Sequence, residues 1–509
     1  MLDGLGMLLG GITHFLTPLS LFNIAWATLL GIVIGALPGL TATMGVALLV
    51  TLTYKMAPDQ AILCLMCIYS GAIYGGSRTA ILLAIPGTPA SAATTLDGHP
   101  LALQGKAGLA MGLATTSSAL GTVIGIVALA LIAPLLAEAA LKFGTYEFFW
   151  LALFGVVISG QLTAMDDPLK GYIAGILGLM VAMVGMETLH AHQRFTFGIP
   201  ALGGGVDLIP AMVGAFGFAE ILGVMKRTAQ ARIVSSSEDR VVPKLSEILK
   251  YWKTTLRSGI IGTFVGIVPG VGEDVGAWAS YAAAKRSSKE ANMFGRGSQE
   301  GLIAAETGNS AVVPGAMIPT LTLALPGSAA AAVLIAAMFI HGIRPGPLLM
   351  TESPEVLYQI VAILLFSTLA ILVFGLTLTR PLLTVLSVPR ERLMAVVYVL
   401  CVVGSFAITQ RMFDIYVMVG FGIAGFILRE MKYPMAPLVL GIILGDLLDL
   451  NLRRGLLLTN GDPSPFFTRP ISAVICLIIV FTILMSIPAV SKRVRSIFSR
   501  SHNGAAAKG

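Results

Sequence analysis

Charge is scarce in this sequence. Only 12% of its 509 residues are Asp, Glu, Lys or Arg, whereas 56% are hydrophobic and the mean hydropathy is +0.87. This composition excludes a series of water-soluble domains, whose surfaces need more charged side chains. Runs such as 121–136, 361–378 and 471–488 approach or reach bilayer-spanning length, and they do not alternate as the strands of a membrane barrel would. We therefore predict an all-α polytopic protein embedded in a lipid bilayer.

Cysteine is equally rare, and so are the motifs of soluble enzymes. Cys64 and Cys67 are spaced as in redox motifs, but their hydrophobic segment favours plain packing. The chain has no Gly-x-x-x-x-Gly-Lys-Ser/Thr phosphate loop and no His-Glu-x-x-His zinc motif. Glu187, His190 and His192 form a weak metal candidate in a loop, where solvated polar residues are the favoured interpretation. We predict no enzyme activity, no catalytic residue, no metal site and no cofactor beyond a coupling ion.

Positive charge is concentrated between the apolar runs. The net charge is +7, and this distribution follows the positive-inside rule rather than a nucleic-acid-binding pattern. Residues 226–257 are predicted to form a basic cytoplasmic loop, and residues 491–509 a basic cytoplasmic tail. Residues 1–54 hold no Lys or Arg, so we expect no removable signal peptide.

Proline and glycine interrupt several of the apolar runs. Within 69–96, Gly75-Gly76-Ser77 and Pro86-Gly87-Thr88-Pro89 are expected to cut a membrane helix into short pieces. Backbone groups freed inside hydrocarbon are costly unless protein, water or ligand satisfies them, so such breaks are tolerated mainly where they line a cavity. Thr88-Pro89 also has the pattern of a helix start, whose free N–H groups suit an anion.

The interrupted segments occur twice. A shift of 240 residues places 70–88 on 310–328 with matching Ser, Gly and Pro-Gly positions, and a shift of 231 places 31–39 on 262–270. Paired interrupted segments in the two halves are typical of a secondary transporter whose site lies at the repeat interface. The alternative is that Pro-Gly pairs are simply common in transmembrane helices.

The charge pattern suggests how the two repeats are related. An uncharged amino terminus leads into the first interrupted segment and a basic loop into the second, so we predict that the repeats are inverted. We expect about 11 to 14 membrane segments. The predicted divisions are a first repeat at 1–225, the basic loop at 226–257, a second repeat at 258–452, an extra carboxy-terminal helix at 471–490 and the tail at 491–509.

Candidate site residues cluster at these breaks. Substrate-binding residues are predicted at the Pro-Gly pairs and among the polar groups beside them. They are Pro38, Gly39, Thr41, Thr43, Ser77, Arg78, Pro86, Gly87, Thr88, Ser91, Pro269, Gly270, Gly272, Asn309, Ser310, Pro326, Gly327 and Ser328. Ionisable residues in apolar surroundings are costly, so Glu273, Asp274 and Glu306 are predicted to couple transport to a cation. Alternatively, Glu273 and Asp274 only cap a half-helix, and Arg78 extends to the headgroups instead of meeting an anionic substrate.

These stretches resemble the large permease subunit of the tripartite tricarboxylate transporters, the TctA family. The resemblance covers residues from about 30 to 350. It rests on 35–40, 74–77 with 85–93, 97–101, 194–198, 266–270, and 318–327 with 341–347. The chain departs from the family pattern at Arg78, Glu273-Asp274, Asn309-Ser310 and Pro314-Gly315, which fall at the predicted site.

The resemblance implies a multi-pass subunit in a bacterial inner membrane that imports di- and tricarboxylates. It also implies a small transmembrane subunit and a periplasmic substrate-binding protein as partners, a sodium or proton gradient as the driving force, and alternating access. On the residues alone, two other functions stay open. One is a passive anion channel with the broken segments as its filter, and the other is a membrane scaffold without transport.

Overall fold

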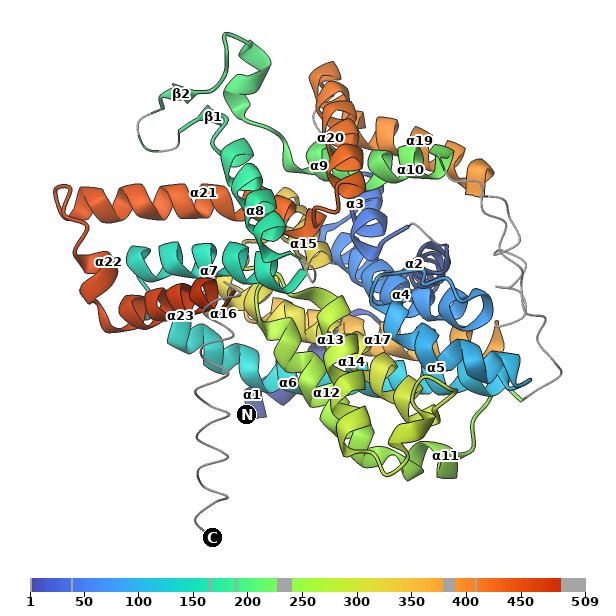
Figure 1. Ribbon diagram of the computed structural model, residues 1–509. Coiled ribbons are helices and arrows are strands. Elements are labelled where there is room, and N and C mark those ends of the chain that lie inside the picture. The colour runs from blue at the N-terminus through green and yellow to red at the C-terminus, as the bar shows by residue number, and fades with distance from the viewer. Residues whose placement is uncertain are drawn as a thin grey trace, which may run out of the picture. The chain divides into compact units, whose positions relative to one another are not determined.

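The chain is almost entirely helical in the computed structural model, which describes residues 2–37, 40–163, 167–187, 189, 191–226, 240–378, 390–407 and 410–486. Within these ranges the β-structure is one antiparallel pair, β1 (Gly185–Met186) and β2 (Gln193–Arg194), as Figure 1 shows. The all-α prediction is confirmed. Parts of the sequence predictions lie outside the described residues, namely Pro38, Gly39, His190, 227–239 and 487–509.

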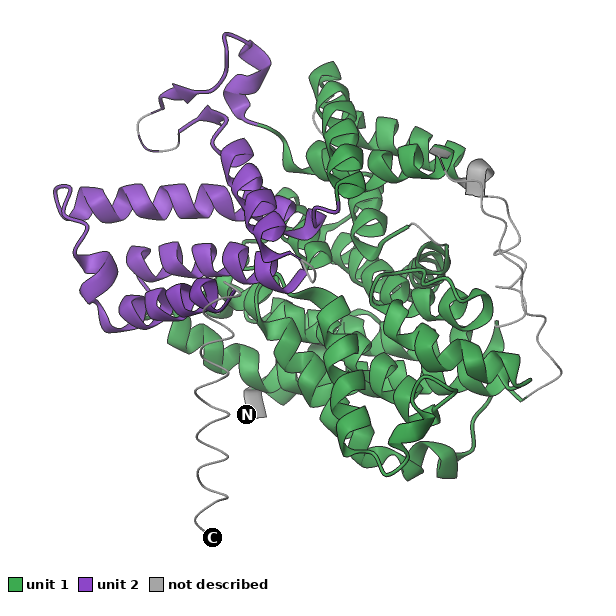
Figure 2. Ribbon diagram, viewed as in Figure 1, with its two compact units in different colours: residues 1–142, 206–431 green, residues 143–205, 432–509 purple. Residues whose placement is uncertain are grey.

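The chain forms two compact units, and both are discontinuous in sequence (Figure 2). Unit 1 comprises Met1–Lys142 and Val206–Met431, and unit 2 comprises Phe143–Gly205 and Lys432–Gly509. Each unit therefore draws on both predicted halves of the chain. The divisions expected from the sequence stay a prediction, because compactness does not test where a repeat begins or ends.

Unit 1 holds the interrupted segments. Its amino-terminal helices are α1 (Leu2–His14), α2 (Pro18–Ala36), α3 (Ala42–Thr53), α4 (Pro58–Leu83), α5 (Ser91–Leu103) and α6 (Ala107–Ala140). A continuous helical stretch follows as α9 (Leu208–Met212), the π-helical η2 (Val213–Phe218) and α10 (Ala219–Lys226). The remaining elements are α11 (Leu245–Lys250), α12 (Trp252–Ile267), α13 (Gly272–Ser287), η3 (Ala291–Met293), α14 (Gln299–Leu323), α15 (Ala329–Ile340), α16 (Leu349–Glu352), α17 (Glu355–Thr377), α19 (Arg390–Ala407) and α20 (Met412–Glu430).

Unit 2 is a smaller helical body. Its elements besides β1 and β2 are α7 (Thr145–Thr163), α8 (Pro168–Ala182), η1 (Pro200–Gly204), α21 (Met435–Leu458), α22 (Pro465–Thr468) and α23 (Pro470–Ser486). Helix α21 packs against α7 and α8. The buried carboxylate of Glu147 accepts hydrogen bonds from Arg469 at 2.9 Å and Ser472 at 2.8 Å, which ties α7 to α23 within this unit.

Eight of the described helices are long and apolar enough to cross a membrane. They are the helices α2, α4, α6, α7, α17, α20 and α21, and the stretch Leu208–Met225. Shorter apolar helices accompany them at Ala42–Thr53, Pro168–Ala182, Ala329–Ile340, Met394–Ala407 and Pro470–Ser486. A polytopic membrane protein is thereby confirmed, whereas the exact number of membrane segments stays a prediction, because a half-length helix does not cross a bilayer alone.

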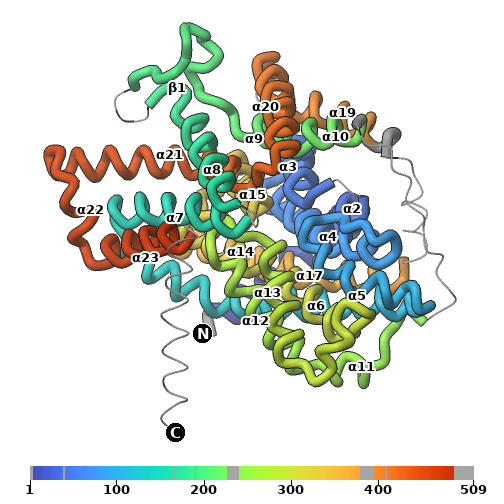
Figure 3. Tube along the Cα trace, viewed as in Figure 1, coloured from blue at the N-terminus to red at the C-terminus, as the bar shows by residue number. Residues whose placement is uncertain are grey.

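Helix packing in unit 1 recurs at the positions that the two sequence shifts relate. Where α2 meets α4, a Cβ on Gly35 would collide with the carbonyl oxygen of Ala72. Where α12 meets α14, a Cβ on Gly266 would collide in the same way with Val312. Small residues let helix backbones approach closely, which is a common packing mode in membranes. Figure 3 shows α12, α13 and α14 lying against one another.

Helices α4 and α14 also end in the same way. Each stops at an alanine in the left-handed conformation, Ala84 with φ +54° and Ala324 with φ +55°. The backbone N–H of Ala84 donates to the Thr79 carbonyl, and that of Ala324 donates to the Pro319 carbonyl. A left-handed residue reverses the chain, so each helix turns through its Pro-Gly pair into a short helix, α5 or α15.

Two local expectations were wrong. Helix α4 continues through Gly75-Gly76-Ser77, where a break was expected. Close packing of neighbouring backbones holds α4 helical at its glycines, because a Cβ on Gly75 would collide with the Ile32 carbonyl of α2. Helix α5 begins at Ser91 rather than beside Thr88-Pro89.

Candidate transport site

The two breaks of the second half lie against each other. Gly270 and Gly272, just after Pro269, have φ of +75° and +77°, a region that favours glycine. Their N–H groups donate to the carbonyl oxygens of Pro326 at 2.9 Å and Gly327 at 3.1 Å. Backbone groups freed by the break between α12 and α13 are therefore satisfied by the turn between α14 and α15.

The turn of the first half packs in a related way. The N–H of Gly87, after Pro86, donates to the carbonyl oxygen of Gly76 at 3.3 Å. A Cβ on Gly87 would collide with the Gly35 carbonyl, and a Cβ on Gly327 would collide with the Gly266 carbonyl. The first Pro-Gly turn thus packs against α2, and the second packs against α12.

Tyr69 connects the two halves at the second turn. Its buried hydroxyl, on α4, donates to the carboxylate of Glu273 and lies 2.8 Å from the hydroxyl of Ser328. Ser328 is the N-cap of α15 and accepts from the Ala331 N–H at 3.2 Å. The polar atoms of this turn therefore satisfy one another without a ligand.

Glu273 and Asp274 occupy the first turn of α13 and are half-buried. A helix N-terminus stabilises negative charge, so the capping interpretation has support. Asp274 also accepts a hydrogen bond from the backbone of Ala90, in the turn before α5. Both carboxylates therefore contact the first half of the chain, at α4 and at the first Pro-Gly turn.

Glu306 is fully buried on α14 and is surrounded by hydroxyl groups. Ser77 lies 2.7 Å from each carboxylate oxygen, Ser118 donates at 2.8 Å, and Thr94 donates as well. Among the described residues, Glu306 forms no ion pair with Lys, Arg or His. A buried carboxyl is costly in that setting unless a proton or a cation compensates its charge.

Several predicted residues carry polar atoms that find no partner in the described structure. The hydroxyls of Thr88 and Ser310 and both amide atoms of Asn309 are buried and unpaired. Each such group costs about 1–3 kcal/mol, so water, an ion or a ligand is the usual explanation. The 240-residue shift relates Thr88 to Ser328 and Asn309 to Tyr69. Thr88 and Asn309 are therefore unpaired at positions whose counterparts in the other half, Ser328 and Tyr69, form hydrogen bonds.

The remaining predicted hydroxyls have local roles. Thr41 is the N-cap of α3 and accepts from the Met44 N–H at 3.2 Å, while Thr43 is buried in the first turn. Ser91 donates to the Thr88 carbonyl at 2.7 Å and accepts from the Thr88 N–H at 3.2 Å. The Thr88 hydroxyl does not cap α5, which corrects the helix start predicted there.

Arg78 is buried on α4, and its guanidinium donates to the Tyr74 hydroxyl and, at 2.8 Å, to the carbonyl oxygen of Gly375 on α17. The guanidinium is therefore held between α4 and α17 rather than extended away from the protein. These contacts fasten α4 to α17, and a substrate contact for Arg78 stays a prediction.

Sequence reasoning missed several polar residues of this region. Asp97 is fully buried within α5 and accepts hydrogen bonds from the N–H groups of Gly295, Gly297 and Ser298 at 2.8–3.0 Å. It also accepts from Tyr281 at 2.9 Å. Asp97 thus anchors α5, which carries Thr94, to the segment before α14. Tyr69, Thr94 and Ser118 lie in apolar or small-residue runs, where composition gives no signal.

The weak metal candidate has a different explanation. Glu187 is buried and pairs with Arg453 at 3.1 Å within unit 2, so it is not a solvated loop residue. His190 lies outside the described residues. Elsewhere in the described chain, no group of three or more His, Cys, Asp or Glu side chains is placed to hold a metal ion.

These observations define a polytopic helical membrane protein whose interrupted helices bring buried polar groups together. The sequence model of the tripartite tricarboxylate transporter TctA family matches residues 21–440. The chain therefore belongs to the TctA family of transporters.

Two curated relatives come from Agrobacterium vitis. One is described as an uncharacterized 52.8 kDa protein in the TAR-I ttuC' 3'region, and it is 34% identical over 472 residues, covering 90% of this chain and 92% of the relative. The other is an uncharacterized protein in the TAR-II ttuC' 3'region, 32% identical over 238 residues, covering 47% of this chain and 98% of the relative. No solved structure matches the chain.

Proposed function

We propose that this chain is the large membrane subunit of a secondary transporter that imports organic di- and tricarboxylates by alternating access. A sodium or proton gradient drives the uptake. A periplasmic substrate-binding protein and a small transmembrane subunit complete the transporter in a bacterial inner membrane. Membership of the TctA family supports this assembly, and the multi-pass helical fold supports its location.

The observation that carries the proposal is the set of helix breaks that meet inside unit 1. Short helices begin at these breaks, and their N-terminal N–H groups favour anions. At the first turn, the Thr88 hydroxyl is buried without a partner. The amide of Asn309, which the 240-residue shift relates to Tyr69, is also buried without one. A hydroxyl and an amide both donate hydrogen bonds to carboxylate oxygens, so this turn is the proposed substrate site.

The proposed coupling residues are Glu273, Asp274 and Glu306. A cation that binds beside a buried carboxylate offsets its charge, so binding of the cation and of an anionic substrate nearby favour each other. Glu306 belongs to the second half, but its carboxylate accepts hydrogen bonds from the hydroxyls of Ser77 and Ser118 in the first half. Binding of a cation beside Glu306 is therefore expected to change the hydrogen bonds that join the two halves.

The repeat architecture supports alternating access. The corresponding packing of Gly35 and Gly266 supports an internal duplication, and inversion of the two repeats stays part of the proposal. Contacts between the halves include Tyr69 with Ser328 and Asp274 with Ala90. We expect these contacts to rearrange when the site switches between opening to one side of the membrane and opening to the other.

Uptake into proteoliposomes tests the proposal. The vesicles would contain this chain and its small subunit, with the binding protein outside and a sodium or proton gradient imposed. We expect saturable uptake of a labelled di- or tricarboxylate that requires both the binding protein and the gradient. Non-saturating uptake that is indifferent to both would instead indicate a passive channel.

A pair of asparagine variants provides the control. Asn309→Ala should abolish most uptake, whereas Asn451→Ala, at a buried residue of unit 2 that bonds to the Leu447 carbonyl, should retain it per folded molecule. If both variants assemble and transport alike, the proposed site is wrong. If substitutions at Gly87 or Gly327 disturb only assembly, and no uptake is found, the chain is a scaffold.

A further inference from the structure

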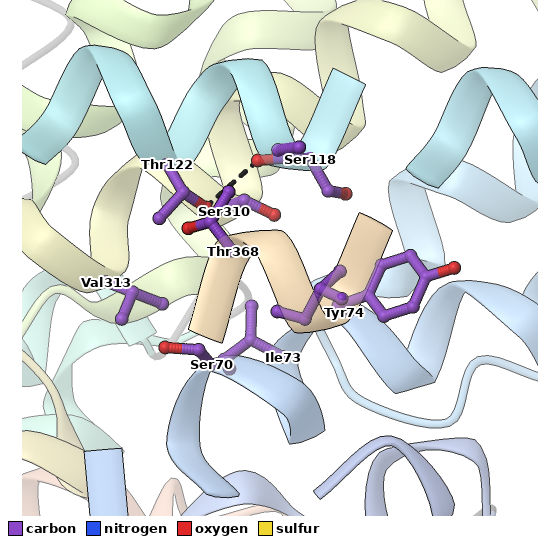
Figure 4. Close-up of a pocket in the computed structure, with 10 residues that line it drawn as sticks. Ser70, Ile73, Tyr74, Ser118, Thr122, Ser310, Val313 and Thr368 are labelled. Carbon is purple, nitrogen blue, oxygen red and sulfur yellow. Dashed lines mark hydrogen bonds between the residues drawn. The ribbon is translucent and has the colours of Figure 1, made fainter. Parts of the chain in front are cut away.

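A small cavity lies between four helices of unit 1, namely α4, α6, α14 and α17. Its volume is about 10 Å³, measured as the space open to the centre of a water molecule. That is room for about one water or one ion of similar size. The hydroxyl-bearing residues on its wall are Ser70 and Tyr74 of α4, Ser118 and Thr122 of α6, Ser310 of α14 and Thr368 of α17. Figure 4 shows these side chains around the cavity, with the Tyr74 ring turned away.

The hydroxyls on this wall are mostly acceptors. Thr122 donates its proton to the Ser118 carbonyl at 3.0 Å, Thr368 to the Leu364 carbonyl at 2.6 Å, and Ser118 to Glu306 at 2.8 Å. A hydroxyl has one proton and two lone pairs, so these three groups have only lone pairs left for other partners. These oxygen lone pairs suit a hard cation better than an anion or a donor-rich ligand. Ile73, Ala119, Val313 and Ile371 form the apolar part of the lining.

Two more hydroxyls on this wall have no partner at all. Ser70 and Ser310 are 5% and 4% exposed, and neither Oγ forms a hydrogen bond in the described structure. The 240-residue shift relates these serines to each other, so the cavity receives the same residue from each half. An unpaired buried hydroxyl is costly, and a cation or a water in the cavity would remove that cost at both serines.

Negative charge is placed one hydroxyl away. Ser118 lines the cavity and donates to the buried carboxylate of Glu306, which has no ion-pair partner among the described residues. A carboxylate attracts a cation more strongly than a neutral water, because the Coulomb attraction acts on net charge.

We propose that this cavity is a binding site for one sodium ion, held by the hydroxyl oxygens of Ser70, Ser118, Thr122, Ser310 and Thr368 and balanced by Glu306. This inference rests on the proposed function, since it names the coupling ion and its place. Because the ligands lie on α4, α6, α14 and α17, an ion there holds four helices in one arrangement.

Equilibrium binding of radioactive ²²Na⁺ tests the site without any transport. The purified full chain in nanodiscs would be titrated at constant ionic strength, with choline replacing sodium. We expect saturable binding to the wild type. The Ser70→Ala and Ser310→Ala double variant should weaken binding at least about tenfold, which corresponds to about 1.4 kcal/mol. Glu306→Gln, which keeps the shape but not the charge, should weaken it further.

A matched control separates the site from general packing. Ser367 is the neighbour of Thr368 on α17, is fully buried and also has an unpaired hydroxyl, but it does not line the cavity. Ser367→Ala should leave the sodium affinity unchanged within about twofold, which is about 0.4 kcal/mol. The melting temperature without sodium reports whether each variant is folded. Should Glu306→Gln fail to fold, Ser310→Val fills the cavity and is expected to abolish binding.

Two results would overturn the inference. One is the absence of saturable ²²Na⁺ binding to the wild type, which would leave water as the occupant. The other is an affinity in the serine double variant equal to that of the wild type. Gradient-driven carboxylate uptake without sodium binding would defeat only this inference. Sodium binding without carboxylate uptake would defeat only the proposed function.

Discussion

The two Pro-Gly turns of unit 1 share a backbone and differ in how their polar groups are satisfied. Helices α4 and α14 both end at a left-handed alanine, and the turns that follow rest on Gly35 of α2 and Gly266 of α12. At the second turn, Ser328 caps α15 and contacts Tyr69, which also holds Glu273. At the first turn, the hydroxyl of Thr88 has no partner. The amide of Asn309, at the position related to Tyr69, has none either.

The packing glycines are alike in the two halves, whereas the polar side chains of the two turns differ. Glycines at corresponding helix contacts are equivalent in both halves, because only a missing Cβ permits those backbone distances. Polar side chains at the two turns are not equivalent. The polar groups of the second turn bond to one another and to Tyr69, whereas the hydroxyl of Thr88 at the first turn can still bind a ligand. Residues that differ between the two turns are therefore candidates for function.

The largest effect is expected at Glu306, which stands where the first half has Met66. Glu306→Ala leaves the hydroxyls of Ser77, Thr94 and Ser118 without their acceptor, so we expect a loss of about 3 kcal/mol of stability and of all gradient-driven uptake. Melting curves and proteoliposome uptake measure the two effects.

A control for this prediction lies on the same helix. Glu300 is also buried and accepts from Thr254 and Ser288, each at 2.6 Å. Glu300→Ala should destabilise the protein but keep uptake per folded molecule. Equal uptake by the Glu306 and Glu300 variants would contradict a special role for Glu306.

The next effect tests the equivalence of the two halves. Gly35→Ala and Gly266→Ala should each destabilise the protein by about 2–3 kcal/mol, because the added methyl group meets a backbone carbonyl that cannot move aside. Unfolding in mixed micelles measures the loss. Gly420→Ala on α20, where nothing lies within 4 Å of the added atom, should be neutral or slightly stabilising. A large loss of stability in only one of the Gly35→Ala and Gly266→Ala variants would show that the two glycine contacts are not equivalent.

The third prediction tests the difference between the turns. Tyr69→Phe removes bonds to Glu273 and Ser328, so we expect it to cost about 1–2 kcal/mol of stability. Thr88→Val removes a hydroxyl that has no partner, so stability should change by less than about 0.5 kcal/mol while the KM for uptake rises about tenfold. The reverse pattern would show that the first turn is the structural one.

The smallest effect concerns the left-handed alanines. Ala84→Gly and Ala324→Gly relieve a conformation that a Cβ disfavours, so each should stabilise the protein by about 0.5–1 kcal/mol, and by the same amount. Ala337→Gly, within α15, provides the comparison and should cost about 1 kcal/mol. Unequal gains at Ala84 and Ala324 would mean that the two helix ends differ more than their backbones indicate.

The fold class was predictable from the sequence, whereas the place of the site stays a prediction. Low charge and long apolar runs are sufficient for a helical membrane protein, and Pro-Gly pairs at related positions indicate where helices end. The buried carboxylate Glu306 was predictable too, because an acid in apolar sequence is rarely accidental. The sequence did not reveal its partners Ser118 and Thr94, since hydroxyls in helices rich in small residues also serve packing alone.

Other features depended on tertiary contacts. The helix break expected at Gly75-Gly76-Ser77 does not occur, because α2 packs closely there and keeps α4 continuous. Asp97 belongs to a sequence with turn composition, yet three N–H groups from residues 295–298 bind it inside α5. The continuity of α4 and the burial of Asp97 both depend on contacts with other segments of the chain. A local sequence pattern carries no information on such contacts.

Protection of single cysteines by substrate tests the central claim most directly. Cys64, Cys67, Cys401 and Cys476 would be replaced, and Thr88→Cys and Ser328→Cys would each be introduced alone. Their alkylation would be followed in proteoliposomes with and without a transported carboxylate. The account predicts that the carboxylate slows alkylation of Thr88→Cys markedly and leaves Ser328→Cys nearly unchanged. Equal protection at both positions, or protection at Ser328→Cys alone, would contradict it.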